Sequence, residues 1–472
     1  MTAMQTFSIH RSELDNVEIR LNADYYAEAI VMANLVLREL ELSGISIKTV
    51  GEITERVFWP GRFKRKYTNK NEGVPFLMPT EVLSFFPIES KYIKDPPADT
   101  KIENWWVLIT RSGTVGRSCI SSNYLRRFAL SDDLIRVLPK SIEMSCYLYA
   151  FLNTWVGRTL ISVNKYGSAI KHIEPNHVNS IRVPILEDVF DEVVKKIRRS
   201  SELLEMARNK IIEAYDLFYK ELGIEPIEED QLYYLPSPED RKIKIFTVRA
   251  SELNYRLDAS YHLPVLRLIS ERIHKSKLST KYIGDVIDDI FVPERFKRNY
   301  VNSPDIGIPF LQGSHIPQIR PLDLKYIWKG TKNIDEMKLK KNWLLMTRSG
   351  TVGRLGIVRE NWDGWAASEH IYRLIPKNND DAGYLLTFLS SEYGQKQIEG
   401  KIYGAVVEEI GESDTDLVNE IELMWPEETH RIRIGNVMLS AYDLRDAANK
   451  LEEEAIRLLE RKLDEAIKKN DQ

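Results

Sequence analysis

One heptapeptide occurs twice in this chain and constrains its fold more than any other feature. Arg-Ser-Gly-Thr-Val-Gly-Arg stands at residues 111–117 and again, letter for letter, at 348–354, an offset of 237 in a chain of 472 residues. An exact match of this length at about half the chain indicates a duplicated large unit. The sequence therefore predicts two copies of one domain, so each further motif is sought in both halves.

Several other segments recur in the same order. A basic segment at 62–65 reads Arg-Phe-Lys-Arg, as does the segment at 295–298, and the apolar stretches 74–77 and 308–311 follow them. An apolar stretch leads into each heptapeptide, at 105–110 and 342–347, and is typical of a β-strand. Further matched strands are expected at 131–137 and 368–374. Helices are expected at 24–42, 145–161 and 382–399.

Each half ends in a long segment with apolar residues at alternating steps of three and four, which is typical of a coiled-coil seam. In the first half, the seam is predicted at Phe190, Val194, Ile197, Leu204, Ile211, Tyr215, Phe218 and Leu222, with Ser201 and Arg208 in the same series. In the second half, it is predicted at Ile434, Val437, Ala441, Leu444, Ala448, Leu451, Ala455 and Leu458. The alternative is that each helix packs only on its own domain.

These patterns predict an α+β fold with two repeated globular domains, separated by a pair of long antiparallel coiled-coil helices and related by a pseudo-twofold. The predicted boundaries are 1–185 for the first domain, 186–225 for the central long helix, 226–425 for a linker and the second domain, and 426–472 for the C-terminal long helix.

Catalytic and metal-binding motifs are not found in the sequence. Asp95-Pro96-Pro97 lacks the aromatic residue of an adenine methyltransferase motif and is interpreted as a turn. Asp289, Glu294 and Lys297 have poor spacing for a nuclease, and no glycine-rich cofactor loop follows a strand. We therefore expect a protein without catalytic residues, metal or cofactor of its own.

Net charge, cysteine content and the lengths of apolar runs limit the cellular compartments and binding partners that we expect for this chain. The net charge is −4, so nucleic-acid binding would require local basic patches. Cys119 and Cys146 match no metal-ligand spacing and cannot build a disulfide framework, which favours the cytoplasm. No signal peptide is recognised, and no apolar run approaches the ~20 residues needed to cross a bilayer.

The recurring basic and glycine-containing segments suit contact with phosphate groups. The candidates in the basic segments are Arg62, Lys64, Arg65, Arg295, Lys297 and Arg298. Those in the heptapeptides are Arg111, Ser112, Gly113, Thr114 and Arg117, with their counterparts Arg348, Ser349, Gly350, Thr351 and Arg354. The alternatives are a solvated loop for the basic segment and a structural hairpin for the heptapeptide.

Residues that are identical in both halves cannot distinguish two different DNA sequences. Base readout is therefore expected where the halves diverge, at 78–91 against 312–324, 118–130 against 355–367, and 164–176 against 401–413. Gln312 and Gln318 would suit adenine, and Lys171 would suit guanine.

With these motifs, the chain resembles the specificity (S) subunits of type I restriction–modification systems. The resemblance rests on Thr-Arg-Ser-Gly-Thr-Val-Gly-Arg at 110–117 and 347–354, on the Arg-Phe-Lys-Arg segments, and on the long helix that ends each half. It covers essentially the whole chain, as two target-recognition domains each followed by a helix. One departure is the acidic stretch Glu408–Asp416 in the second half, which would repel phosphate.

The resemblance implies a non-catalytic subunit that reads a bipartite target in double-stranded DNA. Methyltransferase subunits, which use S-adenosylmethionine, would dock on the helices, and a restriction subunit could join them. A stand-alone DNA-binding adaptor or regulator of another defence system is the first alternative. A scaffold whose repeats bind peptides is the second.

Overall fold

The structure is a computed structural model that describes residues 28–163, 172–228, 232, 234, 245–253, 256–404 and 407–468. Lys171, a predicted base reader, lies outside these residues. The chain divides into two units, one of residues 1–205 with 447–472 and one of residues 206–446. This division crosses both long helices, whereas the boundaries predicted from the sequence separate each helix from its domain.

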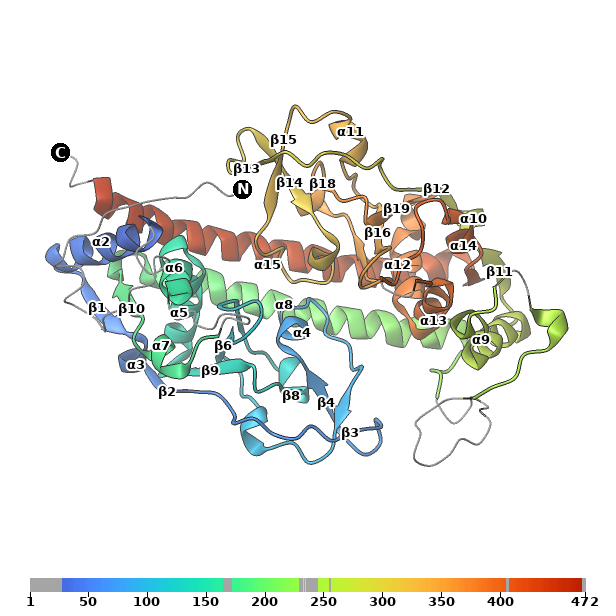
Figure 1. Cartoon of the computed structure of the whole chain (residues 1–472), viewed down its shortest axis with the longest axis horizontal. Coiled ribbons are helices and arrows are strands. Elements are labelled where there is room, and N and C mark those ends of the chain that lie inside the picture. The colour runs from blue at the N-terminus through green and yellow to red at the C-terminus, as the bar shows by residue number, and fades with distance from the viewer. Residues whose placement is uncertain are drawn as a thin grey trace. The chain divides into compact units, whose positions relative to one another are not determined.

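The first unit contains three small sheets and the helices that cover them (Figure 1). Its helices are α2 (Glu28–Leu42), α3 (Val50–Ile53), α4 (Pro79–Val82), α5 (Ile142–Asn153), α6 (Trp155–Val163), α7 (Pro175–Asn179) and the start of α8 (Glu187–Leu222). Its strands are β1 (Ser46–Thr49), β2 (Thr54–Phe58), β3 (Tyr67–Thr68), β4 (Val74–Leu77), β5 (Tyr92–Ile93), β6 (Val107–Thr110), β7 (Ser118–Ile120), β8 (Ala129–Leu130), β9 (Leu134–Pro139) and β10 (Arg182–Ile185).

The second unit has corresponding strands in the same order. Its helices are α9 (Pro264–Lys275), α10 (Ile283–Val286), α11 (Ile334–Met337), α12 (Ala382–Ser390), α13 (Glu392–Lys401), α14 (Thr415–Asn419) and the start of α15 (Glu428–Lys468). Its strands are β11 (Ser279–Tyr282), β12 (Ile287–Phe291), β13 (Tyr300–Val301), β14 (Gly307–Leu311), β15 (Lys325–Trp328), β16 (Leu344–Thr347), β17 (Leu355–Ile357), β18 (Ala366–Ala367), β19 (Ile371–Pro376) and β20 (Glu422–Trp425). Its short helix α11 follows β15, whereas α4 of the first unit precedes β5.

The sheets of the two units have the same topology strand by strand. The sheet β2-β9-β6-β7 of the first unit corresponds to β12-β19-β16-β17 of the second, and we call it the central sheet. The sheet β3-β5-β4-β8 corresponds to β13-β15-β14-β18, and we call it the outer sheet. Even the parallel pairing is repeated, because Phe76 pairs with Ala129 and Phe310 pairs with Ala366. The α+β class and the duplication predicted from the heptapeptide are therefore confirmed.

The helical stretches predicted at 145–161 and 382–399 are confirmed, and each of them consists of two consecutive helices. Thr154 and Ser391 end the first helix and begin the second, where their hydroxyls accept hydrogen bonds from the backbone N–H groups of Gly157 (3.1 Å) and Gly394 (3.4 Å). A Cβ on Gly157 would lie 2.1 Å from a backbone oxygen of the preceding helix. The sharp turn therefore needs a glycine three residues after each cap.

The seam of α8 follows most of the predicted series, since the buried members are Val194, Ile197, Arg208, Ile211, Phe218 and Leu222. Ser201 and Tyr215 are half-buried, and the residues before them, Ser200 and Ala214, are buried in their place. Val193 and Ala207 are buried as well. Small residues were not read as core positions, yet they are the ones that allow two helices to lie close together. The larger Phe190 and Leu204 are half-buried.

The seam of α15 is also displaced at some positions. Ile434, Ala441, Ala448 and Ala455 are buried as predicted. Val437, Leu444, Leu451 and Leu458 are only half-buried, and the residues that follow each of them are buried in their place, namely Met438, Arg445, Glu452 and Leu459. Charged residues can occupy a seam when they are paired. Arg445 is 3.1 Å from Asp446, and Glu452 accepts a hydrogen bond of 2.9 Å from the Tyr149 hydroxyl.

Ion pairs show that the two long helices, the green and red ribbons in Figure 1, run antiparallel where they meet within each unit. In the first unit, Lys196 lies 2.8 Å from Glu454, and Lys462 lies 2.8 Å from Asp188. In the second unit, Arg433 lies 2.9 Å from Glu221. In every pair, a residue further along α8 meets one that is earlier in α15. Packing of each helix on its own domain alone is thus excluded.

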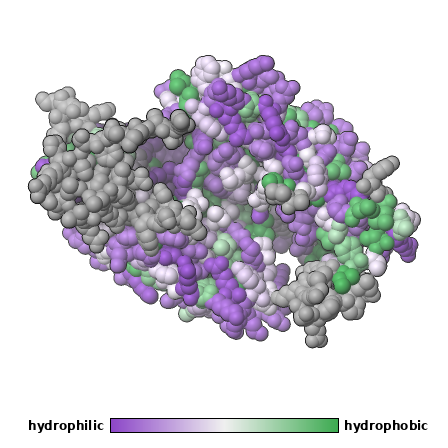
Figure 2. Space-filling view, viewed as in Figure 1, coloured by the Kyte–Doolittle hydropathy of each residue, from purple (hydrophilic) through white to green (hydrophobic). Residues whose placement is uncertain are grey.

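The surface in view is mainly hydrophilic, with scattered hydrophobic patches (Figure 2). Among the helices in the described ranges, none combines the length and the apolar character that a bilayer crossing requires.

One buried arginine sits at the same place in each unit. Arg136 on β9 donates hydrogen bonds to the backbone oxygens of Leu130, Ser131 and Leu134, and Arg373 on β19 does the same with Ala367, Ser368 and Ile371. Burial lowers the pKa of both side chains to about 9, so both stay charged at neutral pH. Through these hydrogen bonds, each arginine connects the end of the short strand β8 or β18 to the central sheet.

We expect Arg136→Met to lower the free energy of unfolding by about 3 kcal/mol or more, because three buried carbonyl groups lose their donors. Arg182→Met is the matched control, since Arg182 pairs with Glu41 at an exposed position and its loss should cost less than about 1 kcal/mol. Urea unfolding of both variants measures the difference. Equal losses would show that the clamp does not stabilise the domain.

Candidate nucleic-acid interface

The basic segment follows the first strand of the central sheet in each unit and alternates between inward and outward side chains. Phe63 packs against Phe76 with ring centroids 6.4 Å apart, and Phe296 packs against Phe310 at 6.0 Å. These aromatic side chains anchor the segment on the outer sheet. Arg62 and Lys64, and likewise Arg295 and Lys297, are exposed on either side of the anchors.

The last arginine of each segment is held by a carboxylate of its own domain. Arg65 lies 2.6 Å from Asp132, and Arg298 lies 2.7 Å from Glu369. Burial acts to raise the pKa of Glu369, but hydrogen bonds and the charge of Arg298 outweigh it, so the pKa is lowered and the pair is charged at neutral pH. Arg65 and Arg298 therefore position the segment, and Arg62, Lys64 and Lys297 form no ion pair with any described residue.

The heptapeptide is the turn between two antiparallel strands, β6–β7 in the first unit and β16–β17 in the second. The backbone oxygen of Thr110 accepts a hydrogen bond of 2.9 Å from the N–H of Gly116, and its Oγ1 accepts one of 2.9 Å from the N–H of Arg117. Thr347 makes the same bonds with Gly353 and Arg354. Because these N–H groups donate hydrogen bonds within the turn, they are not available as donors to a phosphate.

The two glycines of the turn have different surroundings. Gly113 (φ +70°) is exposed, and a Cβ there would have no atom within 4 Å. Gly116 (φ +86°) faces helix α6, where a Cβ would lie 2.6 Å from Cγ2 of Ile161. Gly353 approaches Ile398 of α13 in the same way, at 3.0 Å. The turn is thus seated on a helix, while Gly113 and Thr114, and likewise Gly350 and Thr351, form its exposed tip.

The first arginine of the motif points inward and is buried, which the sequence did not suggest. Arg111 is 7% exposed, lies 2.6 Å from Glu174 and 3.7 Å from Asp133, and stacks on the Trp59 ring at 4.2 Å. Ser112 donates a hydrogen bond of 2.7 Å to the same Asp133. The alternative of a structural hairpin is therefore the better description of this part of the motif, and phosphate contact by Arg111 would require the pair to open.

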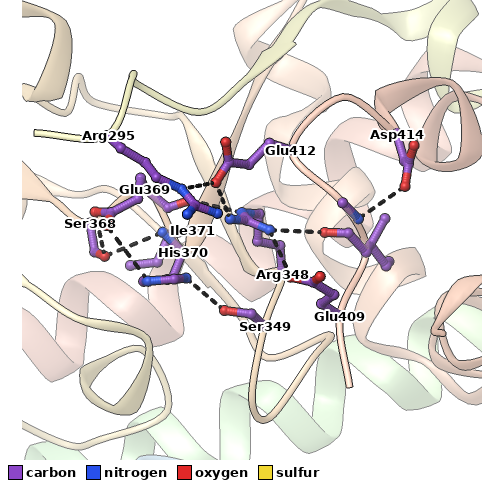
Figure 3. A network of polar contacts seen from close by, with 12 residues as sticks. Arg295, Arg348, Ser349, Ser368, Glu369, His370, Ile371, Glu409, Glu412 and Asp414 are labelled. Carbon is purple, nitrogen blue, oxygen red and sulfur yellow. Dashed lines mark hydrogen bonds and ion pairs between the residues drawn. The ribbon is translucent and has the colours of Figure 1, made fainter. Parts of the chain in front are cut away.

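Arg348 is more enclosed still, at 1% exposure, and lies in the network of Figure 3. It donates hydrogen bonds to a carboxylate oxygen of Glu412 (2.7 Å) and to the backbone oxygen of Glu369 (2.9 Å). Ser349 lies 2.8 Å from the His370 ring. Glu412 comes from the acidic stretch in which the second half departs from the first, so this stretch supplies the counter-charge that Glu174 supplies in the first unit.

The acidic partners Asp132, Asp133, Glu174, Glu369 and Glu412 were not predicted as site residues. A signal existed for some of them. Ser131-Asp132-Asp133 and Ser368-Glu369-His370 stand at matched positions, where the sequence pattern alone predicts the starts of strands.

The residues predicted to read bases differ in burial and in hydrogen bonding. Gln318 uses its side-chain oxygen to accept a hydrogen bond of 2.9 Å from the N–H of Leu322, which shapes its own loop. Gln312 is half-buried at the start of a short turn, and Arg117 and Arg354 are half-buried after the motif. Base contact by these side chains stays a prediction. Across the residues that the structure describes, no group of three or more His, Cys, Asp or Glu could hold a metal ion.

Comparison with known families identifies the second half directly. A model described as the type I restriction modification DNA specificity domain matches residues 276–432, from the end of α9 to the start of α15. The first unit repeats the strand order and the motifs of this matched region. The match to this family covers residues 276–432 alone.

Solved structures of the same kind are similar at low identity. The S subunit of a type I restriction-modification system from M. genitalium is 12% identical over 89% of this chain and 94% of its own, with a TM-score of 0.34. The HsdS subunit from Thermoanaerobacter tengcongensis is 13% identical over 90% and 96%, with a TM-score of 0.28. A structure concerned with complex assembly of the type I R-M system is 14% identical over 89% and 97%, at 0.27. No curated protein matches significantly.

Gly113 is open to solvent and Gly116 faces Ile161 of α6, so their substitution should affect stability differently. We expect Gly113→Ala to cost about 1 kcal/mol, because only the positive φ opposes it. Gly116→Ala should cost roughly 1–3 kcal/mol more, since its methyl group must displace Ile161. Chemical denaturation of the two variants, one glycine apart in the same turn, gives the comparison. Equal costs would contradict the seating of the turn on α6.

Proposed function

We propose that this chain is the DNA-recognition subunit of a type I restriction–modification complex and reads a bipartite target in double-stranded DNA. The observation that carries the proposal is the match of the second unit to a specificity domain, together with the repeat of its topology in the first unit. Each unit exposes a basic segment anchored by a half-buried phenylalanine, Phe63 or Phe296. Two readers in one chain suit two half-sites. Reading different half-sites requires the divergent loops, because the shared residues cannot distinguish bases.

In this proposal, phosphate contacts and base contacts have separate sources. Arg62, Lys64, Arg295 and Lys297 are exposed and would contact phosphates, which positions each domain without reading sequence. Gln312 and Gln318, and Lys171 outside the described residues, remain candidate readers. Arg65 and Arg298 would act by fixing the basic segment, since each is paired within its domain.

The chain would contribute recognition and no chemistry. The S-adenosylmethionine needed for adenine methylation would be bound by methyltransferase subunits docked on the long helices, and a restriction subunit could join the assembly. A DNA target of this kind would place the chain in the cytoplasm. An adaptor that binds DNA without a methyltransferase is the second candidate, and co-purification with methyltransferase subunits distinguishes the two.

Domain exchange tests the function directly. Replacing the second specificity domain with that of a relative, in a host that also carries the neighbouring methyltransferase genes, should change one half of the methylated motif and leave the other half intact. Sequencing of the modified adenines provides the measurement. A change in both halves, or no adenine methylation that depends on this chain, would contradict the proposal.

The phosphate contacts are tested by salt dependence. We expect Arg62→Ala with Lys64→Ala to weaken binding to all duplexes about equally and to reduce the slope of log affinity against log salt by about 2. The matched control is Arg38→Ala with Lys48→Ala, which removes the same charge from exposed positions on α2 and β1. Similar slopes for both double variants would show that the basic segment does not contact DNA phosphates.

A further inference from the structure

The acidic stretch of the second specificity domain is fixed on the turn of the heptapeptide. The N–H of Gly350 donates a hydrogen bond of 3.0 Å to the backbone oxygen of Glu408, and the N–H of Ile410 donates one of 2.8 Å to that of Arg348. The stretch is also bridged to Tyr403, whose N–H donates a hydrogen bond of 3.0 Å to the backbone oxygen of Glu409. Its carboxylates are therefore held beside the motif.

One of these carboxylates joins two arginines that have different environments. Figure 3 shows Glu412 between Arg295 and Arg348, and its Oε1 accepts hydrogen bonds of 2.8 Å from Arg295 Nε and 2.7 Å from Arg348 Nη2. Arg348 is 1% exposed and has further partners, so it anchors Glu412. Arg295 is 73% exposed and belongs to the basic segment, so it is the partner that can leave.

The described residues of the first domain do not show this arrangement. Its motif arginine, Arg111, pairs with Glu174, whereas Arg62, the counterpart of Arg295, forms no ion pair with any described residue. Both domains thus pair the buried motif arginine with a carboxylate, but among the described residues only the second domain also pairs the exposed first arginine of its basic segment, Arg295. The difference lies in a segment where the two halves diverge in sequence.

We propose that Glu412 is an internal phosphate mimic that occupies Arg295 until a DNA phosphate displaces it. The inference rests on the proposed function. A guanidinium binds a carboxylate and a phosphate through the same donors, so the two compete for Arg295. Glu412 also carries a negative charge close to where the phosphate would lie, and this repels DNA that cannot offer compensating contacts. The second domain therefore binds non-specific DNA more weakly than the first, and a correct half-site supplies the contacts that release Arg295.

The test is Glu412→Gln in the full-length chain, with a duplex that lacks any target sequence as the probe. Glutamine keeps an oxygen for Arg348 but loses the charge that holds Arg295. One additional phosphate contact steepens the slope of log affinity against log salt by about 0.9, so the gain in affinity over the wild type should grow about threefold between roughly 200 and 50 mM salt. Glu174→Gln is the matched control. It removes the same charge beside an arginine that is buried, so its slope should equal that of the wild type.

A second pair of variants assigns the effect to Arg295. Arg295→Ala should leave the slope nearly unchanged in the wild-type background, and should abolish the gain in the Glu412→Gln background. A Glu412→Gln variant that binds more weakly would show that Glu412 positions Arg295 for DNA, and one that binds like the wild type would show no competition. Either result would overturn the inference. Failure of the wild-type chain itself to bind DNA would overturn the proposed function and the inference with it.

Discussion

In each unit, a guanidinium at the start of the heptapeptide is buried and held by carboxylates from other parts of the same unit. In the first domain, Arg111 joins the hairpin to Asp133, before β9, and to Glu174, before α7. Removing one partner of a buried pair costs about 3–5 kcal/mol, because the remaining charge is left without compensation. The hairpin, the central sheet and the last short helix are thus tied at one point, and the exposed tip of the turn is held on that support.

The sequence predicted the duplication, the α+β class and the antiparallel helices, because each rests on a pattern that local chemistry preserves. The prediction from the sequence was wrong at positions where a small or charged residue is buried in the helix seam. Ser200 and Ala207 lie in the seam because they are small, and Arg445 and Glu452 lie there because they are paired. The same limit applies to the candidate interface. Arg111 and Arg62 look alike in sequence, and only the positions of acidic residues far along the chain distinguish a buried arginine from an exposed one.

The two domains show how one scaffold accommodates divergence. Both keep the pair between the motif arginine and a carboxylate, but the carboxylate is Glu174 directly before α7 in one domain and Glu412 within a longer acidic loop in the other. The hairpin is therefore held by a carboxylate placed next to the motif arginine, and this carboxylate need not have a fixed distance along the sequence. This leaves the loop free to change in length and composition while the support of the hairpin is kept.

The division of the chain has a consequence for the order in which the protein can fold during synthesis. The first unit contains residues from both ends of the described chain, since α15 contributes Glu452 and Glu454, which contact Tyr149 and Lys196. The second unit is continuous in sequence. On the ribosome, domains tend to fold in the order of their synthesis. Here, Val193 and Ile197 of α8 share a hydrophobic cluster with Leu459 and Leu463 of α15, so this part of the first core is completed only after the entire second domain has been translated.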